Sequence, residues 1–276
     1  MVYKVENMNA DEIKTMNYLG IPLEKPKVGI FGFTGCEGCQ LQIANKEDTL
    51  LDLLGAIEVL NFRLISSDKQ DGYDIAFVEG SITTDDEAEQ LKKIREQVKI
   101  LVAMGACACL GGVHKLRERF EISDSLQEVY GDHPVKSGPV RKVSDVVPVD
   151  IELPGCPISK PEFEWLVRHL ILGLDPQFPQ YSVCVECKQR FNTCVFDLGV
   201  MCLGPVTRAG CNAICPRNLH GCWGCRGPAD EANFESMIEI LRQHGFTEHQ
   251  IAERAQFFNA FSGVEHFQKI EISHVP

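Results

Sequence analysis

Short apolar runs alternate with amphipathic stretches over residues 27–172. Charged or glycine-rich segments bound each run, which is the pattern of strands buried on both faces of a sheet. The predicted strands cover residues 27–33, 59–65, 74–79, 99–104 and 146–153. Because helices are predicted between them, we expect an α/β fold with a largely parallel sheet.

The intervening helices have recognisable ends. A capping box of the Thr-x-x-Glu type opens a helix over residues 84–98, and a proline at the first turn opens another over 161–172. Residues 41–54 carry leucines at helical spacing, and a glycine follows them. The glycine-rich residues 105–112 are predicted to form a loop, and residues 113–145 have a less regular pattern.

The end of the chain, residues 229–276, is predicted to be helical. Phe234, Met237 and Leu241 have helical spacing, and a second capping box lies at Thr247-Glu-His-Gln250. We expect an antiparallel helix pair here, with its aromatic residues used in core packing.

Composition and charge narrow the class of protein. The chain has 276 residues and a formal net charge of −12, which argues against a nucleic-acid partner. Residues 1–26 contain no apolar segment of the kind found in export signals. The longest apolar run, residues 100–113, is shorter than the ~20 residues that span a bilayer. We therefore expect a cytoplasmic protein with reduced thiols and no membrane span.

Cysteines are concentrated between residues 184 and 225, where eight of the thirteen lie. They are Cys184, Cys187, Cys194, Cys202, Cys211, Cys215, Cys222 and Cys225. Few apolar residues accompany them, so burial of hydrocarbon cannot by itself fold this segment. Disulfides, two zinc ribbons and iron–sulfur clusters all use cysteine at such density, although disulfides need an oxidising compartment. Eight thiolates divide into two groups of four.

The other five cysteines follow predicted strands. Cys36 and Cys39 come after the first strand, Cys107 and Cys109 after the fourth, and Cys156 after the fifth. The carboxyl ends of parallel strands line one edge of a sheet, so these residues are expected to meet there. Cys36, Cys39, Cys156 and one of Cys107 or Cys109 would form a third group of four thiolates. The remaining cysteine is then an ordinary buried small residue.

Five motifs in this order resemble the small subunit of nickel–iron hydrogenases, over about residues 27–228. They are Cys36-x-x-Cys39, Phe77-Val-Glu-Gly-Ser-Ile82, Gly105-Ala-Cys107-Ala, Gly155-Cys156-Pro157 and Cys202-Leu-Gly-Pro-Val-Thr-x-x-x-Cys211. The resemblance implies a flavodoxin-like domain with a proximal cluster over residues 27–180, a small irregular domain with medial and distal clusters over 181–228, and a helical tail over 229–276.

The resemblance also implies which cysteines hold each cluster. The proximal ligands would be Cys36, Cys39, Cys107 and Cys156, which leaves Cys109 over. The distal ligands would be Cys184, Cys187, Cys194 and Cys202, and the medial ligands Cys211, Cys215, Cys222 and Cys225. No catalytic residue is expected, because the nickel–iron site of this family lies on a separate large subunit.

Two positions depart from the exported, membrane-attached branch of the family. That branch has histidine where this chain has Cys184, and commonly proline where it has Cys215. Ligation by thiolates alone implies three [4Fe–4S] clusters of low potential. The resemblance is therefore to the cytoplasmic branch, in which a flavin or iron–sulfur partner subunit reduces NAD(P), a deazaflavin or heterodisulfide.

Alternatives remain open at this point. A complex I-type small subunit shares the flavodoxin-like domain but has a single cluster, and a related complex could have a large subunit without nickel. Glu79, at the end of the third strand, could line the subunit interface, tune protons or cap nearby backbone amides. His220 is interpreted as a solvated loop histidine.

Overall fold

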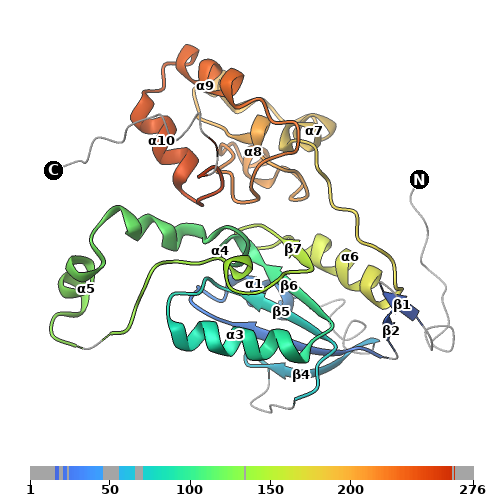
Figure 1. Cartoon of the computed structure of the whole chain (residues 1–276). Coiled ribbons are helices and arrows are strands. Elements are labelled where there is room, and N and C mark those ends of the chain that lie inside the picture. Colours follow the sequence, from blue (N-terminus) through green and yellow to red (C-terminus); the bar gives the residue numbers. More distant parts are fainter. Residues whose placement is uncertain are drawn as a thin grey trace.

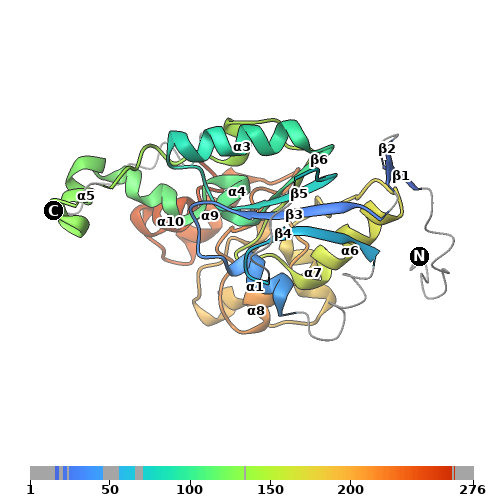
Figure 2. The same ribbon diagram turned by 90° about the horizontal axis from the view of Figure 1, so that it is seen from below.

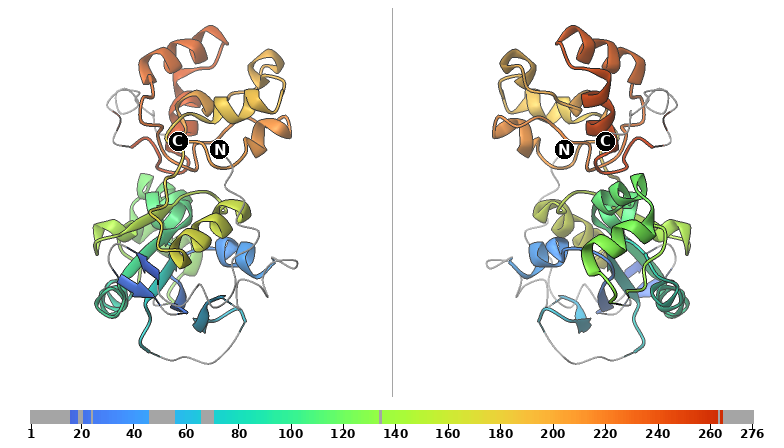
Figure 3. Two further views of the ribbon diagram at one scale, coloured as in Figure 1. Left: turned by 90° about the vertical axis from the view of Figure 1, so that its right-hand side faces the viewer. Right: turned by 90° about the vertical axis from the view of Figure 1, so that its left-hand side faces the viewer.

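The computed structural model describes residues 16–18, 21–23, 25–45, 56–65, 71–133, 135–262 and 264. The polypeptide forms two lobes (Figure 1). One lobe contains the main sheet and its helices, and the other contains most of the chain after residue 181. The two side views in Figure 3 show the second lobe seated over one end of the first. Among the described residues, no helix is long and apolar enough to cross a membrane.

The main sheet has five strands. They are β3 (Lys27–Gly32), β4 (Glu58–Phe62), β5 (Ile75–Glu79), β6 (Ile100–Met104) and β7 (Ile151–Leu153). Their order is β4-β3-β5-β6-β7, and every neighbouring pair is parallel. This is the flavodoxin-like order, whose switch point lies between β3 and β5. The predicted α/β class with a parallel sheet is confirmed.

Both faces of the sheet are covered, which explains the continuous apolar runs. Helices α1 (Gly38–Ala44) and α6 (Lys160–Ile171) pack on one face, and α3 (Asp85–Gln97) packs on the other (Figure 2). Every residue of β5 and β6 is buried. The capping box at the start of α3 is present, because the Thr84 side chain accepts from the Glu87 amide and the Glu87 carboxylate accepts in return.

Three local predictions differ from the structure. The segment predicted as a loop over 105–112 contains helix α4 (Gly105–Leu110). The last strand is only three residues long, because Pro148 has no amide for the ladder and Val143–Asp145 form a 3₁₀ turn, η3. The less regular region contains η2 (Gly112–Arg119) and a projecting helix α5 (Ile122–Tyr130). The predicted continuation of α1 over residues 46–55 lies outside the described residues.

Short elements make up most of the second lobe. They are α7 (Val183–Gln189), η4 (Val195–Leu198), η5 (Gly204–Val206), α8 (Ile214–Arg217), α9 (Phe234–Gln243) and α10 (Glu248–Gln256). A separate hairpin of β1 (Met16–Tyr18) and β2 (Ile21–Leu23) precedes the main sheet. The capping box predicted at Thr247 opens α10. The boundaries predicted at residues 180 and 228 are not tested by these elements.

The tail supplies the hydrocarbon that the cysteine-rich segment lacks. Met237 and Leu241 of α9 and Ile251 of α10 form one buried cluster with Leu203 and Val206. The helices predicted after residue 229 are therefore present, and they pack against the segment that contains the cysteines.

Candidate metal centres

Four cysteines meet at the carboxyl edge of the sheet, as predicted. Cys36 lies between β3 and α1, Cys39 lies in the first turn of α1, Cys107 lies on α4 after β6, and Cys156 follows β7. Burial and then the charges of Cys156 and Cys36 raise the pKa of the Cys107 thiol to about 12. Burial likewise raises the pKa of Cys39, with Glu79 and Cys156 adding to the effect. Each thiol is thus within electrostatic reach of others in this group, which we call the proximal group.

Glycine backbone lies directly against the sulfur atoms of the proximal group. A Cβ atom added at Gly105 would lie 2.5 Å from the Cys39 sulfur, and one at Gly112 would lie 2.8 Å from the Cys107 sulfur. Gly105 has φ of +88°, in the left-handed region that favours glycine. Glycine lets the backbone approach the sulfur atoms this closely, and a set of four thiols is the donor set that an iron–sulfur cluster uses.

Glu79 is buried at the end of β5 and caps backbone amides. Its carboxylate accepts hydrogen bonds from the amides of Cys39 (2.9 Å) and Gln40 (3.0 Å). The side chain therefore holds the first turn of α1, and with it the Cys39 ligand loop. The capping alternative for Glu79 is the one that the hydrogen bonds support.

Cys109 lies apart from the proximal group. Its thiol is buried and donates to the Ala103 carbonyl oxygen at 3.3 Å. Burial raises its pKa, and the charged groups with the largest effects on it are Glu152, Arg208 and Arg226. These surroundings are those of a small core residue.

A second set of four cysteines gathers around α7. Burial, followed by the charges of Cys202, Cys187 and Cys194, raises the pKa of the Cys184 thiol to about 12. The Cys202 sulfur accepts from the amides of Cys222 (3.2 Å) and Gly204 (3.4 Å). The four predicted distal ligands are therefore near one another, and we call them the distal group.

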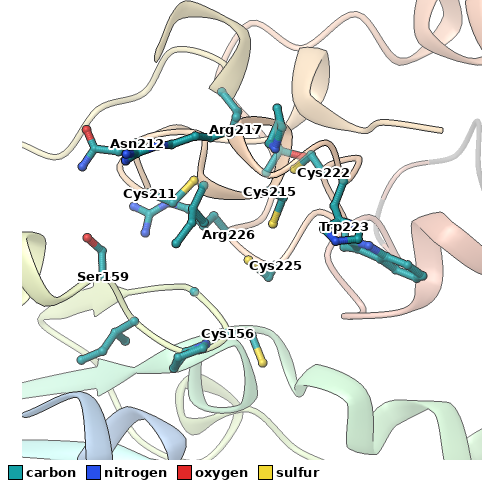
Figure 4. Close-up of a pocket in the computed structure, with 18 of the residues that line it drawn as sticks. Cys156, Ser159, Cys211, Asn212, Cys215, Arg217, Cys222, Trp223, Cys225 and Arg226 are labelled. Carbon is teal, nitrogen blue, oxygen red and sulfur yellow. The ribbon is translucent and has the colours of Figure 1, made fainter. Parts of the chain in front are cut away.

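The four predicted medial ligands are Cys211, Cys215, Cys222 and Cys225, and we call them the medial group. Burial and the charge of Cys211 raise the pKa of the Cys225 thiol to about 12. Figure 4 shows these side chains around one cavity, with Cys156 on its opposite side. The cavity has a volume of about 990 Å³. His220 also lines it and is exposed, as expected for a solvated loop histidine.

The three groups form a continuous row. The backbone amide of Cys156, in the proximal group, lies near enough to the Cys225 thiol of the medial group to lower its pKa, although burial raises that pKa overall. The amide of Cys222, in the medial group, donates to the Cys202 sulfur of the distal group. These two contacts link the predicted proximal group to the medial group and the medial group to the distal group.

Comparison with known proteins gives consistent relatives. The family described as "NADH ubiquinone oxidoreductase, 20 Kd subunit" matches residues 36–170. Sulfhydrogenase 2 subunit delta of Pyrococcus furiosus is 38% identical over 221 residues, which cover 79% of this chain and 92% of the relative. A subunit of the F420-non-reducing hydrogenase of Methanocaldococcus jannaschii is 29% identical over 271 residues, covering 86% of this chain and 94% of the relative.

A solved structure, that of a NAD⁺-reducing [NiFe]-hydrogenase in the H2-reduced state, is also similar. It is 27% identical, with a TM-score of 0.52, and the alignment covers 56% of this chain and 96% of that one. The chain belongs to the family of nickel–iron hydrogenase small subunits. This small subunit transfers electrons through iron–sulfur clusters, and its partner is a large subunit that contains the catalytic site.

Two buried glutamates of this small subunit could not be recognised as buried from the sequence. The Glu186 carboxylate on α7 accepts hydrogen bonds from the amides of Gly210 (2.9 Å) and Ala213 (3.2 Å). These bonds connect α7, which contains Cys184 and Cys187, to the loop that contains Cys211. Glu162 on α6 faces Arg226, and burial raises the pKa of its carboxyl against the opposing charge of that guanidinium. Within a helical pattern such glutamates look like solvent-facing positions, so no local signal singles them out.

Proposed function

We propose that this small subunit holds three [4Fe–4S] clusters between the nickel–iron site of its large subunit and an electron acceptor. The observation that supports the proposal is the row of three adjoining groups, each with four cysteines. The division into residues 27–180, 181–228 and 229–276 is part of the same proposal. Each bound cluster would supply reversible one-electron storage. Thiolates hold the clusters, and burial limits access of water to them.

The ends of the row suggest where the two partners bind. Cys36 and Cys156 of the proximal group are exposed in the isolated chain, so a partner is needed to exclude water there. We place the large subunit at this edge. The distal group then faces a cytoplasmic flavin or iron–sulfur acceptor subunit, which reduces NAD(P), a deazaflavin or heterodisulfide. Thiolate ligation throughout the row suits such a low-potential acceptor.

Metal analysis tests the number and type of clusters. The small subunit, purified without oxygen together with its partners, is expected to contribute about twelve irons with matching acid-labile sulfide. The reason is that twelve cysteines occupy three groups. Stoichiometric zinc without labile sulfide in this chain would contradict the proposal.

A matched pair of substitutions tests which cysteine is left over. Cys107→Ser is expected to lose the proximal cluster, about four irons per chain, because Cys107 lies with Cys36 and Cys156. Cys109→Ser should keep all the iron, because a serine hydroxyl can also donate to the Ala103 carbonyl. Iron content and the visible spectrum of each purified variant give the answer. Equal iron loss in both variants would show that the ligand assignment is wrong.

A further inference from the structure

One buried ion pair lies at the junction of the two lobes. Arg226 and Glu162 form two parallel hydrogen bonds, each 2.7 Å long. Their side chains are only 1% and 7% exposed. A buried arginine of this kind is permanently charged, and its planar guanidinium suits a carboxylate with two oxygens.

Arg226 also bonds to the loops that contain cysteines of two different groups. Its Nη1 donates to the Pro154 carbonyl oxygen at 2.6 Å, two residues before Cys156 of the proximal group. Its Nε donates to the Ala209 carbonyl oxygen at 2.7 Å, two residues before Cys211 of the medial group. Since Arg226 itself follows Cys225, one guanidinium connects the proximal loop with both halves of the medial group.

The two charges of the pair are not placed equally with respect to the medial thiols. The Arg226 guanidinium is the strongest charged influence on the Cys211 thiol, and it also acts on Cys225. Arg226 lines the cavity around the four medial cysteines, and Glu162 is not among the residues that line it. Figure 4 shows the Arg226 side chain extending beside Cys211. The positive member of the pair therefore lines the space around the medial cysteines, whereas the negative member lies on α6 and does not line that space.

A charge beside the medial cysteines changes the reduction potential of a cluster bound there. Four thiolates give a bound cluster negative charge, which increases by one when the cluster is reduced. A buried cation stabilises the more negative state strongly, because the surroundings screen it little. A carboxylate paired with that cation weakens the effect. An apolar junction would hold the lobes together as well, since buried ion pairs add little net stability over packed hydrocarbon.

We propose that the Arg226–Glu162 pair sets the reduction potential of the medial group relative to the proximal group and keeps their ligand loops at a fixed separation. Arg226 is a positioning residue that favours the electron on the medial side, and Glu162 limits that preference. This inference rests on the proposed function, because it requires a cluster in the medial group.

Two neutral, similarly shaped substitutions separate the electrostatic role from a structural one. Arg226→Gln removes a positive charge, so the midpoint potential of the medial cluster is expected to fall. Glu162→Gln removes a negative charge and leaves Arg226 uncompensated, so the same potential is expected to rise. Loosening of the junction would not give shifts of opposite sign. The measurement is a redox titration of the assembled hydrogenase, followed by electron paramagnetic resonance, with the medial signal identified as the one lost in Cys211→Ser.

A surface pair on the same helix provides the control. Arg168 and Glu164 are 2.6 Å apart and partly exposed, so Arg168→Gln should leave the medial potential unchanged. Shifts of the same sign in the two test variants, or no shift in Glu162→Gln, would overturn the inference. If Arg226→Gln loses iron, Arg226→Lys replaces it, because lysine keeps the positive charge. The medial midpoint potential of Arg226→Lys must then be closer to the wild-type value than that of Glu162→Gln. If Cys211→Ser removes no electron paramagnetic resonance signal that the wild-type protein shows, the result contradicts the proposed three clusters instead.

Discussion

Cys187→Ala is expected to remove reduction of the natural acceptor to near background while hydrogen–deuterium exchange persists. Cys187 belongs to the distal group, at the far end of the row from Cys36. Exchange needs only the nickel–iron site and its proton path, which lie on the large subunit. Acceptor reduction needs every member of the row. Small dyes that can take electrons from the medial or proximal group should lose less activity than the natural acceptor.

Cys36→Ala provides the comparison from the other end of the row. Its loss should lower reduction of both dye and natural acceptor, because electrons cannot then enter the small subunit. The three assays to run on both variants are isotope exchange, dye reduction and reduction of the natural acceptor. If Cys187→Ala spares the natural acceptor, or if both variants have the same profile, electrons do not travel from the Cys36 end to the Cys187 end.

Gly105→Ala is expected to remove the proximal cluster without changing any ligand. The added methyl carbon would lie 2.5 Å from the Cys39 sulfur and 3.6 Å from the Gly155 carbonyl oxygen. Both atoms belong to loops that contain proximal cysteines, so neither can retreat without displacing a ligand. The left-handed backbone at Gly105 adds about 1–2 kcal/mol of strain to the folded state. Iron should fall by about four per chain, and dye reduction should fall with it.

Gly131→Ala separates the backbone strain from the contact with sulfur. Gly131 also has a positive φ, +58°, but an added Cβ there would meet nothing within 4 Å. This variant should lose stability without losing iron. Thermal unfolding and iron content, measured on both variants, distinguish the two effects. Equal iron in Gly105→Ala and Gly131→Ala would mean that the Gly105 backbone does not shape the proximal site.

Features that depend on short-range patterns could be predicted directly. The capping boxes at Thr84 and Thr247 require only residues three apart, and both are present. Strands buried on both faces need continuous apolar runs, so β5 and β6 are visible as such runs. The meeting of Cys36, Cys107 and Cys156 follows from a general rule, because parallel strands present their carboxyl ends at one edge.

Predictions failed where local cues conflicted. Residues 105–112 contain three glycines, which favoured a loop, yet Gly105 and Gly111 adopt positive φ only at the ends of α4. The four residues between Gly105 and Leu110, all alanine or cysteine, have no polar face that would reveal a helix. The last strand was predicted too long because Pro148 was included in an apolar run.

Other features depend on residues that are far apart in the sequence. Arg226 and Glu162 are separated by 64 positions, and neither has a sequence context that marks it as buried. The apolar side chains that pack against the cysteine-rich segment come from α9 and α10, which follow it in the chain. The resemblance to hydrogenase small subunits assigns twelve cysteines to three sets. The contact of Cys222 with Cys202 arises from the folding of the second lobe, and the proximity of Cys156 to Cys225 arises only when the two lobes pack together.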